Sequence, residues 1–323
     1  MAGSVVCRQC RHLIQSGRGE QVGKQFYKLT TGEKVFKIVI YLLIIALCLS
    51  IILPFMNILA LSFNAGKDAE RGGVYFWPRL WSIENYKEVF LSANIGKAFG
   101  ISIFRTVVGT LASVFMTAMA AYALKGKTMP GVKFFTLIIF FTMLFSGGII
   151  PYYMLLKSLS LTNTIWVYII PGLYSAWNLI IMRTFFQQIH PSLEESARID
   201  GYNDFSIFMK IIMPLSRPVV AVIALFNAVT HWNDWFTGAF YVRSASLRPL
   251  STLLQEMLMR AEALRDTLAQ AAGSRYELLE KIQVTGNSLK MATIMIVVTP
   301  IILIYPFIQK YFAKGVMIGS LKE

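Results

Sequence analysis

The sequence predicts an all-α membrane protein with six transmembrane helices. Hydrophobic residues make up 55% of the 323 positions, and mean hydropathy is +0.56. Six apolar runs are separated by charged segments. Because lipid cannot hydrogen-bond an exposed backbone, an apolar run of about 20 residues is expected to cross the roughly 30 Å hydrocarbon layer as a helix. A soluble fold is therefore the weaker interpretation.

The predicted spans define one large domain. An N-terminal extension at 1–34 precedes a six-span domain at 35–312, and a tail follows at 313–323. An even number of spans places both termini on the same side of the membrane. The spans are 35–63, 98–124, 134–156, 164–187, 218–242 and 291–308.

The distribution of basic residues predicts which side that is. Lys and Arg number 31 against 17 acidic residues, a net charge of +14. These charges flank apolar runs, so lipid headgroups explain them better than nucleic acid does. The turn after the second span holds three lysines and no acid, and lysines also precede the first span. Both termini are therefore expected on the cytosolic side of the membrane.

The N-terminal extension contains a lone CxxC pair, Cys7 and Cys10, with His12 close by. A closed zinc site needs four ligands, and no second pair follows, so no metal is expected. Cys48 is the third cysteine. About 35 polar residues precede the first apolar run, which is unlike a cleavable signal peptide, so the extension is expected to stay attached.

Two long linkers, 64–97 and 243–290, are then expected outside. In the second linker, apolar residues recur at helical spacing and predict an amphipathic helix. This helix would either rest on the chain's own spans or dock an external partner. The apolar positions are Leu250, Leu253, Leu254, Met257, Leu258, Ala261, Leu264 and Leu268.

The segment between the fourth and fifth spans, residues 188–217, predicts two short helices joined by a break, here called the elbow. Ser192 and Glu195 are spaced as in a capping box, and Gly201 can take the left-handed conformation that ends a helix. Asn203 or Asp204 can cap the second helix. Such a cytosolic elbow could transmit force between subunits.

The elbow resembles the EAA loop of the permease subunits of ABC importers, through Glu195-Ser-Ala-Arg-Ile-Asp-Gly201 and the spaced residues that follow. Ser196 and Met213 differ from the usual pattern by small exchanges. The resemblance implies the type I permease fold and makes the elbow the coupling helix that sits in a groove of the ATP-binding subunit. The coupling residues it implies are Glu194, Glu195, Ala197, Asp200, Gly201, Phe208 and Pro214.

Segments 145–151, 181–186, 231–236 and 309–319 are similar to the oligosaccharide branch of these permeases. The resemblance implies a second permease subunit, two ATPases that bind ATP and Mg²⁺, and an external solute-binding protein. It also makes the tail around Lys314 and Gly315 a further ATPase contact.

Polar residues within spans are costly and mark candidate functional positions. Arg105 in the second span could line the path or pair with Asp234 at the outer end of the fifth. Aromatic rings that stack on sugars, together with groups that bond hydroxyls, suggest further substrate contacts, although interfacial anchoring or helix packing also explains them. These are Tyr174, Trp177, Asn178, Asn227, His231, Trp232 and Asn233. Gly147, Gly148 and Pro151 are expected to loosen the third span.

The leading hypothesis is a permease subunit that moves an oligosaccharide by alternating access. No GxxxxGK[ST] phosphate loop and no catalytic cluster occur in the sequence, so no enzymatic activity and no cofactor are expected on this chain. A basic outer lining would also suit acidic sugars. The alternatives are a permease for peptides, amino acids or ions, a channel or carrier without an ATPase, and a membrane anchor.

Overall fold

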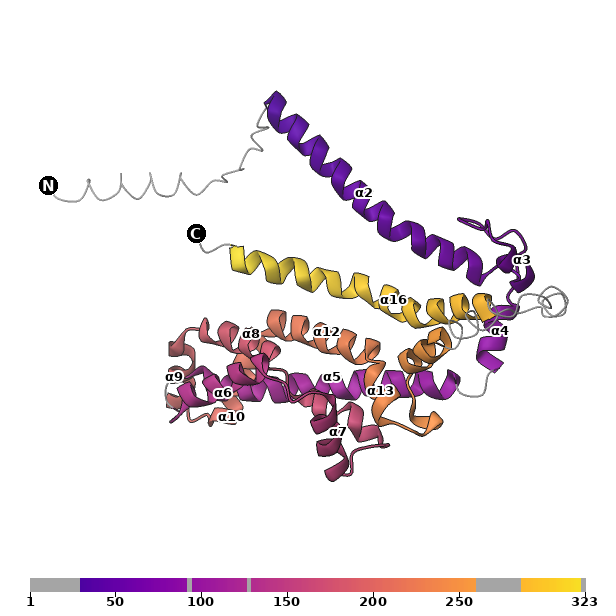
Figure 1. Ribbon diagram of the computed structural model, residues 1–323. Helices are drawn as coiled ribbons and strands as arrows, with labels where there is room; N and C mark the ends of the chain where they lie inside the picture. Colours follow the sequence, from indigo (N-terminus) through magenta and orange to yellow (C-terminus); the bar gives the residue numbers. More distant parts are fainter. Residues whose placement is uncertain (1–29, 92–94, 127–128, 260–285, 321–323) are drawn as a thin grey trace. The chain divides into compact units, whose positions relative to one another are not determined.

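The computed structural model describes residues 30–91, 95–126, 129–259 and 286–320, and most of these are helical (Figure 1). The chain divides into two compact units, Met1–Pro54 and Phe55–Glu323, which are described separately. The elements, in chain order, are α2 (Thr31–Ser62), α3 (Gly66–Arg71), α4 (Glu84–Leu91), α5 (Ile95–Lys125), α6 (Val132–Leu144), α7 (Ile149–Ser158), η1 (Ile165–Tyr168), η2 (Pro171–Leu173), α8 (Ala176–Gln187), α9 (Pro191–Ile199), α10 (Asp204–Ile207), η3 (Phe208–Ile212), α11 (Met213–Leu215), α12 (Arg217–Asn233), α13 (Phe236–Tyr241), η4 (Ala245–Leu247) and α16 (Gly286–Ser320).

The first unit holds the N-terminal part of α2. Its side chains from Thr31 to Pro54 are exposed and mostly apolar, as expected of a helix that faces lipid. Cys48 is an exposed free thiol on this helix. Cys7, Cys10 and His12 lie outside the described residues.

Three of the predicted spans are continuous helices: α2, α5 and α16 are each long and apolar enough to cross a membrane. Three further pairs of helices, each bent at a short break, are long and apolar enough to cross a membrane when the two helices of a pair are taken as one span. The described residues therefore hold up to six candidate spans. This agrees with the predicted all-α, six-span class.

The expectation of one continuous helix over 134–156 is wrong. α6 ends at Leu144, residues 145–148 are not helical, and α7 turns away by 120°. Gly148 takes the left-handed φ of +82°, which favours glycine, and Pro151 lies in the first turn of α7. The predicted loosening is therefore a full break.

The fourth and fifth predicted spans are also interrupted. In the fourth, the 3₁₀ turns η1 and η2 meet α8 at 43°. In the fifth, α12 ends at Asn233 because Asp234 is extended, with ψ at 99°, and the short α13 follows. Hydropathy alone does not define these breaks, although Asn233 and Asp234 interrupt the apolar run of the fifth span.

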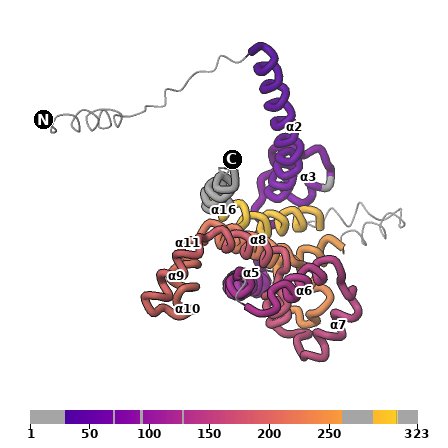
Figure 2. Tube along the Cα trace, turned by 90° about the vertical axis from the view of Figure 1, so that its left-hand side faces the viewer, coloured from indigo at the N-terminus to yellow at the C-terminus, as the bar shows by residue number. Residues whose placement is uncertain are grey.

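α5 lies at the centre of the second unit and packs against α8 and α12 (Figures 1 and 2). Its buried face is rich in small residues, which allow neighbouring backbones to approach closely. These are Ser102, Gly109, Thr110, Ser113, Thr117, Ala118 and Ala121.

Residues 250–259 are helical, as the periodicity in the second linker predicts. Leu250 is buried, and Leu253, Leu254 and Met257 pack against the cluster that contains Val89, from α4. The same cluster includes residues of α5 and α16. The described part of this helix therefore rests on the chain's own helices, the first of the two alternatives. Ala261, Leu264 and Leu268 lie outside the described residues.

The close approach of α12 and α5 generates a prediction. A Cβ on Gly109 would lie 2.6 Å from Nε2 of His231, whereas a Cβ on Gly100 of the same helix would meet nothing within 4 Å. Gly109→Ala is expected to lower stability by about 1–3 kcal/mol, because overpacking forces atoms apart. Thermal unfolding of the purified protein in detergent measures this.

Gly100→Ala is the matched control and should leave the melting temperature unchanged or slightly raised. Once His231→Ala has removed the ring, the added Cβ should meet no clash. The double variant Gly109→Ala, His231→Ala should therefore be at least as stable as His231→Ala alone. Equal melting temperatures for Gly109→Ala and Gly100→Ala would contradict the packing described.

Candidate functional site

The predicted functional residues gather at the two ends of α5. The end that carries the elbow is called the elbow end, and the end near residues 250–259 is called the linker end. Arg105 and Lys125 mark these ends on α5, about 30 Å apart at 1.5 Å per residue. This distance is close to the thickness of the hydrocarbon layer.

The elbow consists of α9 and α10, followed by the π-helical turn η3 and α11. Gly201 separates the first two helices with a φ of +83°, as predicted for a left-handed glycine. Asn203 caps α10, because its Oδ1 accepts a hydrogen bond from the Ser206 amide at 2.8 Å. The capping box expected at Ser192 and Glu195 is wrong: the cap lies two residues earlier, at His190, and α9 begins at Pro191.

The elbow is attached to the spans by one ion pair and an apolar cluster. Lys125 Nζ, at the end of α5, donates a hydrogen bond to Glu194 Oε1. Ala197 and Phe208 are 5% and 2% exposed, and they pack in one cluster with residues of α5, α8 and α12. Burial of a phenylalanine contributes about 1.5–3 kcal/mol, so the elbow should move together with these helices.

The opposite side of the elbow is open. Glu195, Asp200 and Gly201 are exposed, and Ile199 beside them is 86% exposed. Phe205 is 59% exposed. An exposed apolar surface flanked by carboxylates is typical of a protein interface rather than of a surface that only meets water.

Two other predicted coupling positions differ in their surroundings. Pro214 is exposed at the far end of the elbow. Lys314 and Gly315 lie in α16, where only the backbone is described. Sequence reasoning missed Lys125, which lies in the lysine-rich turn after the second span and 69 positions from Glu194 along the chain.

At the linker end, Arg105 is fully buried and holds three segments together. Its Nη2 donates to the carbonyl oxygen of Trp232 at 3.2 Å and to Ser251 Oγ at 3.0 Å. Nη1 lies 3.7 Å from Asp234 Oδ2. The guanidinium also lies over the Tyr168 ring, 5.2 Å from its centre. We call Arg105, Trp232, Asp234 and Ser251 the linker-end clamp.

Further hydrogen bonds connect the clamp and its neighbour Leu250 to α5 and α16. Ser251 Oγ donates to the carbonyl oxygen of Asp234 at 3.0 Å, and the Leu250 amide donates to Ser102 Oγ at 2.8 Å. Trp232 Nε1 donates to the carbonyl oxygen of Val297 in α16 at 3.0 Å. Arg105, Trp232 and Asp234 thus come together as a packing centre. Sequence reasoning missed Ser251 and Tyr168, which lie far away along the chain.

The remaining substrate-path candidates divide by exposure. Asn178 and Asn227 are buried and joined by a hydrogen bond of 3.2 Å between α8 and α12. His231 is buried against Gly109 and Gly172. Tyr174 and Trp177 are 50% and 61% exposed at the bend of the fourth span, and Asn233 is exposed as well. Of these six candidates, only the exposed Tyr174, Trp177 and Asn233 are accessible to a solute.

The chain matches the model of a protein family described as "Binding-protein-dependent transport system inner membrane component" over residues 102–318. It is 38% identical to the polygalacturonan/rhamnogalacturonan transport system permease protein YtcP of Bacillus subtilis, covering 90% of this chain and 99% of that protein. It is also 38% identical to protein LplC of the same organism, covering 84% and 89%.

A solved structure shows the same fold. It is the crystal structure of a bacterial ABC transporter involved in the import of the acidic polysaccharide alginate. The similarity covers 88% of this chain and 99% of that chain, with a TM-score of 0.78 and 29% sequence identity.

The linker-end clamp generates a prediction about stability. Asp234→Asn leaves the buried Arg105 charge without its ionic partner, which should cost about 3 kcal/mol. Arg105→Met combined with Asp234→Asn should be more stable than Asp234→Asn alone, because no buried charge remains. Thermal unfolding of each variant in detergent gives the comparison.

Arg79→Met breaks an ion pair with Asp68 of the same 3.7 Å length, in which the Arg79 side chain is 48% exposed. That control should change stability by at most about 1 kcal/mol. If the double variant is less stable than Asp234→Asn, the clamp does not hold Arg105 as described.

Proposed function

The chain belongs to the family of binding-protein-dependent transport system inner membrane components, and from this premise we propose that it is one of two permease subunits of an importer for acidic oligosaccharides. Two ATP-binding subunits supply the energy, and an external solute-binding protein delivers the substrate. The observation that carries the coupling part is the elbow, which is fixed to α5 on one side and open on the other.

The elbow has the properties that a coupling element needs. Its attached side includes Glu194, Ala197 and Phe208, so a displacement of the elbow would be transmitted to α5 and α8. Its open side carries Glu195 and Asp200 for a partner. ATP and Mg²⁺ belong to that partner in this proposal, because the chain has no phosphate-binding loop of its own. The α16 tail with Lys314 and Gly315 is proposed as a second contact.

The substrate proposal draws on the relatives and on exposed aromatic rings. One relative is named for polygalacturonan and rhamnogalacturonan, and the similar structure concerns the acidic polysaccharide alginate. The exposed rings of Tyr174 and Trp177 offer faces on which sugars stack.

The orientation follows the distribution of basic residues. Lys125 lies at the elbow end, and Lys34 and Lys37 precede the apolar part of α2. We propose that the elbow and both termini are cytosolic in a bacterial cytoplasmic membrane, and that the linker end faces the binding protein.

The coupling proposal predicts the effect of changing Gly201. Valine at a φ of +83° is strained, so Gly201→Val should distort the junction of α9 and α10. Uptake and substrate-stimulated ATP hydrolysis by the assembled importer should both be lost, while the chain still inserts and assembles. Glu195→Ala should have the same effect through loss of the exposed carboxylate.

Gly72→Val is the matched control, because Gly72 also has a positive φ, +74°, and open surroundings, but lies in the first linker. It should retain coupled uptake. If Gly201→Val and Glu195→Ala both transport at the wild-type rate, the elbow is not the coupling site.

The substrate proposal predicts which solute stimulates ATP hydrolysis. In proteoliposomes that contain the full importer and its binding protein, trigalacturonate should stimulate hydrolysis and accumulate inside. A neutral arabinotriose should do so less, and a tripeptide should have no effect. Stimulation by the tripeptide alone would show that the chain serves a peptide importer.

A further inference from the structure

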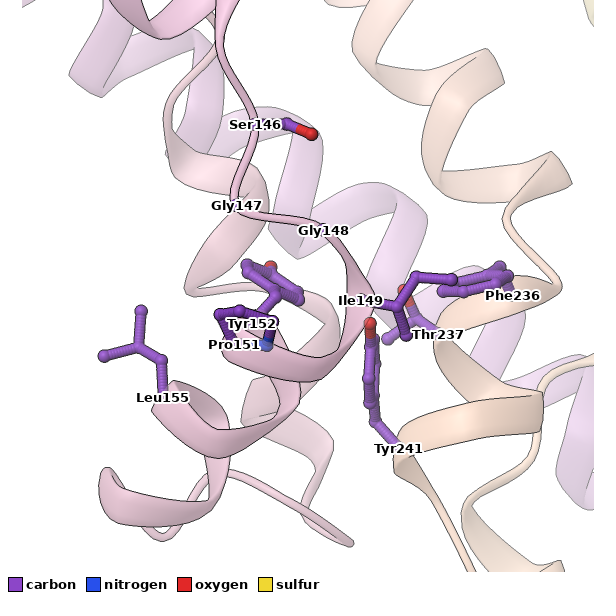
Figure 3. A pocket seen from close by; sticks show the side chains of 10 residues that line it. All are labelled: Ser146, Gly147, Gly148, Ile149, Pro151, Tyr152, Leu155, Phe236, Thr237 and Tyr241. Carbon is purple, nitrogen blue, oxygen red and sulfur yellow. The ribbon is translucent and has the colours of Figure 1, made fainter.

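The break in the third span opens into a pocket (Figure 3). Its volume is about 560 Å³, within the range of small-molecule sites. One wall is formed by the break itself and the first turns of α7, and the other by α13. The lining residues are Ser146, Gly147, Gly148, Ile149, Pro151, Tyr152, Leu155, Phe236, Thr237 and Tyr241.

The backbone at the break is open on the side of the pocket. Residues 145–148 are non-helical and exposed, within a span that passes the hydropathy test. Non-helical backbone at membrane depth is tolerated only where it is buried in protein or lines a watery cavity. The break is therefore expected to face an aqueous space.

α7 begins at this wall with unpartnered amides. It is a helix of ten residues, and its N-cap, Gly148, has no side chain that could accept from the first amides, which belong to Ile149 and Ile150 because Pro151 has none. The first amides of a helix lack partners within the helix, and the helix dipole makes this end positive. In membrane transporters, the N-termini of broken helices point at anionic groups of the substrate.

A second, independent feature points to a ligand. Tyr241 is only 5% exposed, and its hydroxyl is directed into the pocket, as Figure 3 shows. No hydrogen bond to this hydroxyl is present among the described residues, although the ring contacts Tyr152 at 5.7 Å between centres. A hydroxyl that faces the pocket without a partner among these residues is free to pair with a bound molecule, which then gains affinity.

The chemistry of the pocket selects its ligand. The ten lining residues include no acidic or basic side chain, so the positive end of α7 is the charge that the pocket wall supplies. Tyr152 is 40% exposed and offers an aromatic face, while Thr237 and Tyr241 offer hydroxyls. One carboxylate, several hydroxyls and an apolar ring face are combined in a hexuronate.

We propose that this pocket is a binding subsite for one uronate residue of the transported oligosaccharide. The amides at the start of α7 bind the carboxylate, the hydroxyls of Tyr241 and Thr237 bind sugar hydroxyls, and the Tyr152 ring packs on the sugar face. The subsite rests on the proposed import of acidic oligosaccharides.

The test compares trigalacturonate with its neutral methyl ester in the full importer. Ser146→Asp places a negative charge beside the α7 amides, where it also favours the helix and so should not impair folding. It should raise the half-saturation concentration for trigalacturonate about tenfold, and that for the methyl ester less than about twofold. Ser158→Asp, at the other end of α7, carries the same charge and should change neither value.

Tyr241→Phe removes the unpaired hydroxyl and keeps the ring. It should raise the half-saturation concentrations of both sugars by about three- to tenfold. Tyr153→Phe is the control, since Tyr153 stacks on Tyr241 outside the pocket, and it should leave both values unchanged.

Binding of trigalacturonate to the complex in nanodiscs is measured beside uptake, which separates the two proposals. If Ser146→Asp selectively weakens binding in a complex that does not import the sugar, the subsite stands and the proposed import is overturned. If the wild-type importer takes up trigalacturonate and Ser146→Asp behaves as Ser158→Asp does, the import stands and the subsite is overturned. Equal weakening of both sugars by Ser146→Asp would also overturn carboxylate recognition.

Discussion

The close packing of α5 against α8 and α12 is the interaction on which the rest of the structure depends. Small side chains on α5 let these helices approach, and larger groups fit only at particular positions, such as His231 against Gly109. The same helix holds the elbow through Lys125 at one end and the linker-end clamp through Arg105 at the other. These two attachment points lie about 30 Å apart along α5. One rigid helix can therefore connect events on the two sides of a membrane.

The bilayer explains why the interrupted helices are informative. A span interior has no water to satisfy free backbone groups, so each break requires protein partners or an aqueous cavity. The end of α12 meets the first requirement, because Ser251 and Thr252 donate hydrogen bonds to the carbonyl oxygens of Asp234 and Trp235. The break between α6 and α7 instead borders a pocket with an unpaired tyrosine hydroxyl. The two breaks consequently suggest different roles, one in stability and one in binding.

Sequence patterns revealed the class, the six spans and the elbow, because these depend on local composition and spacing. Gly201 and Asn203 are examples, since turn and cap preferences are local. The contacts between side chains inside the spans could not be predicted in the same way. Arg105 could be singled out as costly, but Ser251 lies 146 positions away, and only the folded chain brings the two together. Hydropathy likewise continues across 145–148, so the 120° turn of α7 was not predicted.

The central claim is that the open face of the elbow is the contact with an ATP-binding subunit. It is tested most directly by placing a photo-reactive benzophenone amino acid at Ile199, the most exposed apolar residue of the elbow, in the assembled importer. Ile83, 62% exposed in the first linker, is the comparison position. The account predicts a covalent product with the ATP-binding subunit from position 199 and none from position 83. Products from position 83, with none from 199, would contradict it.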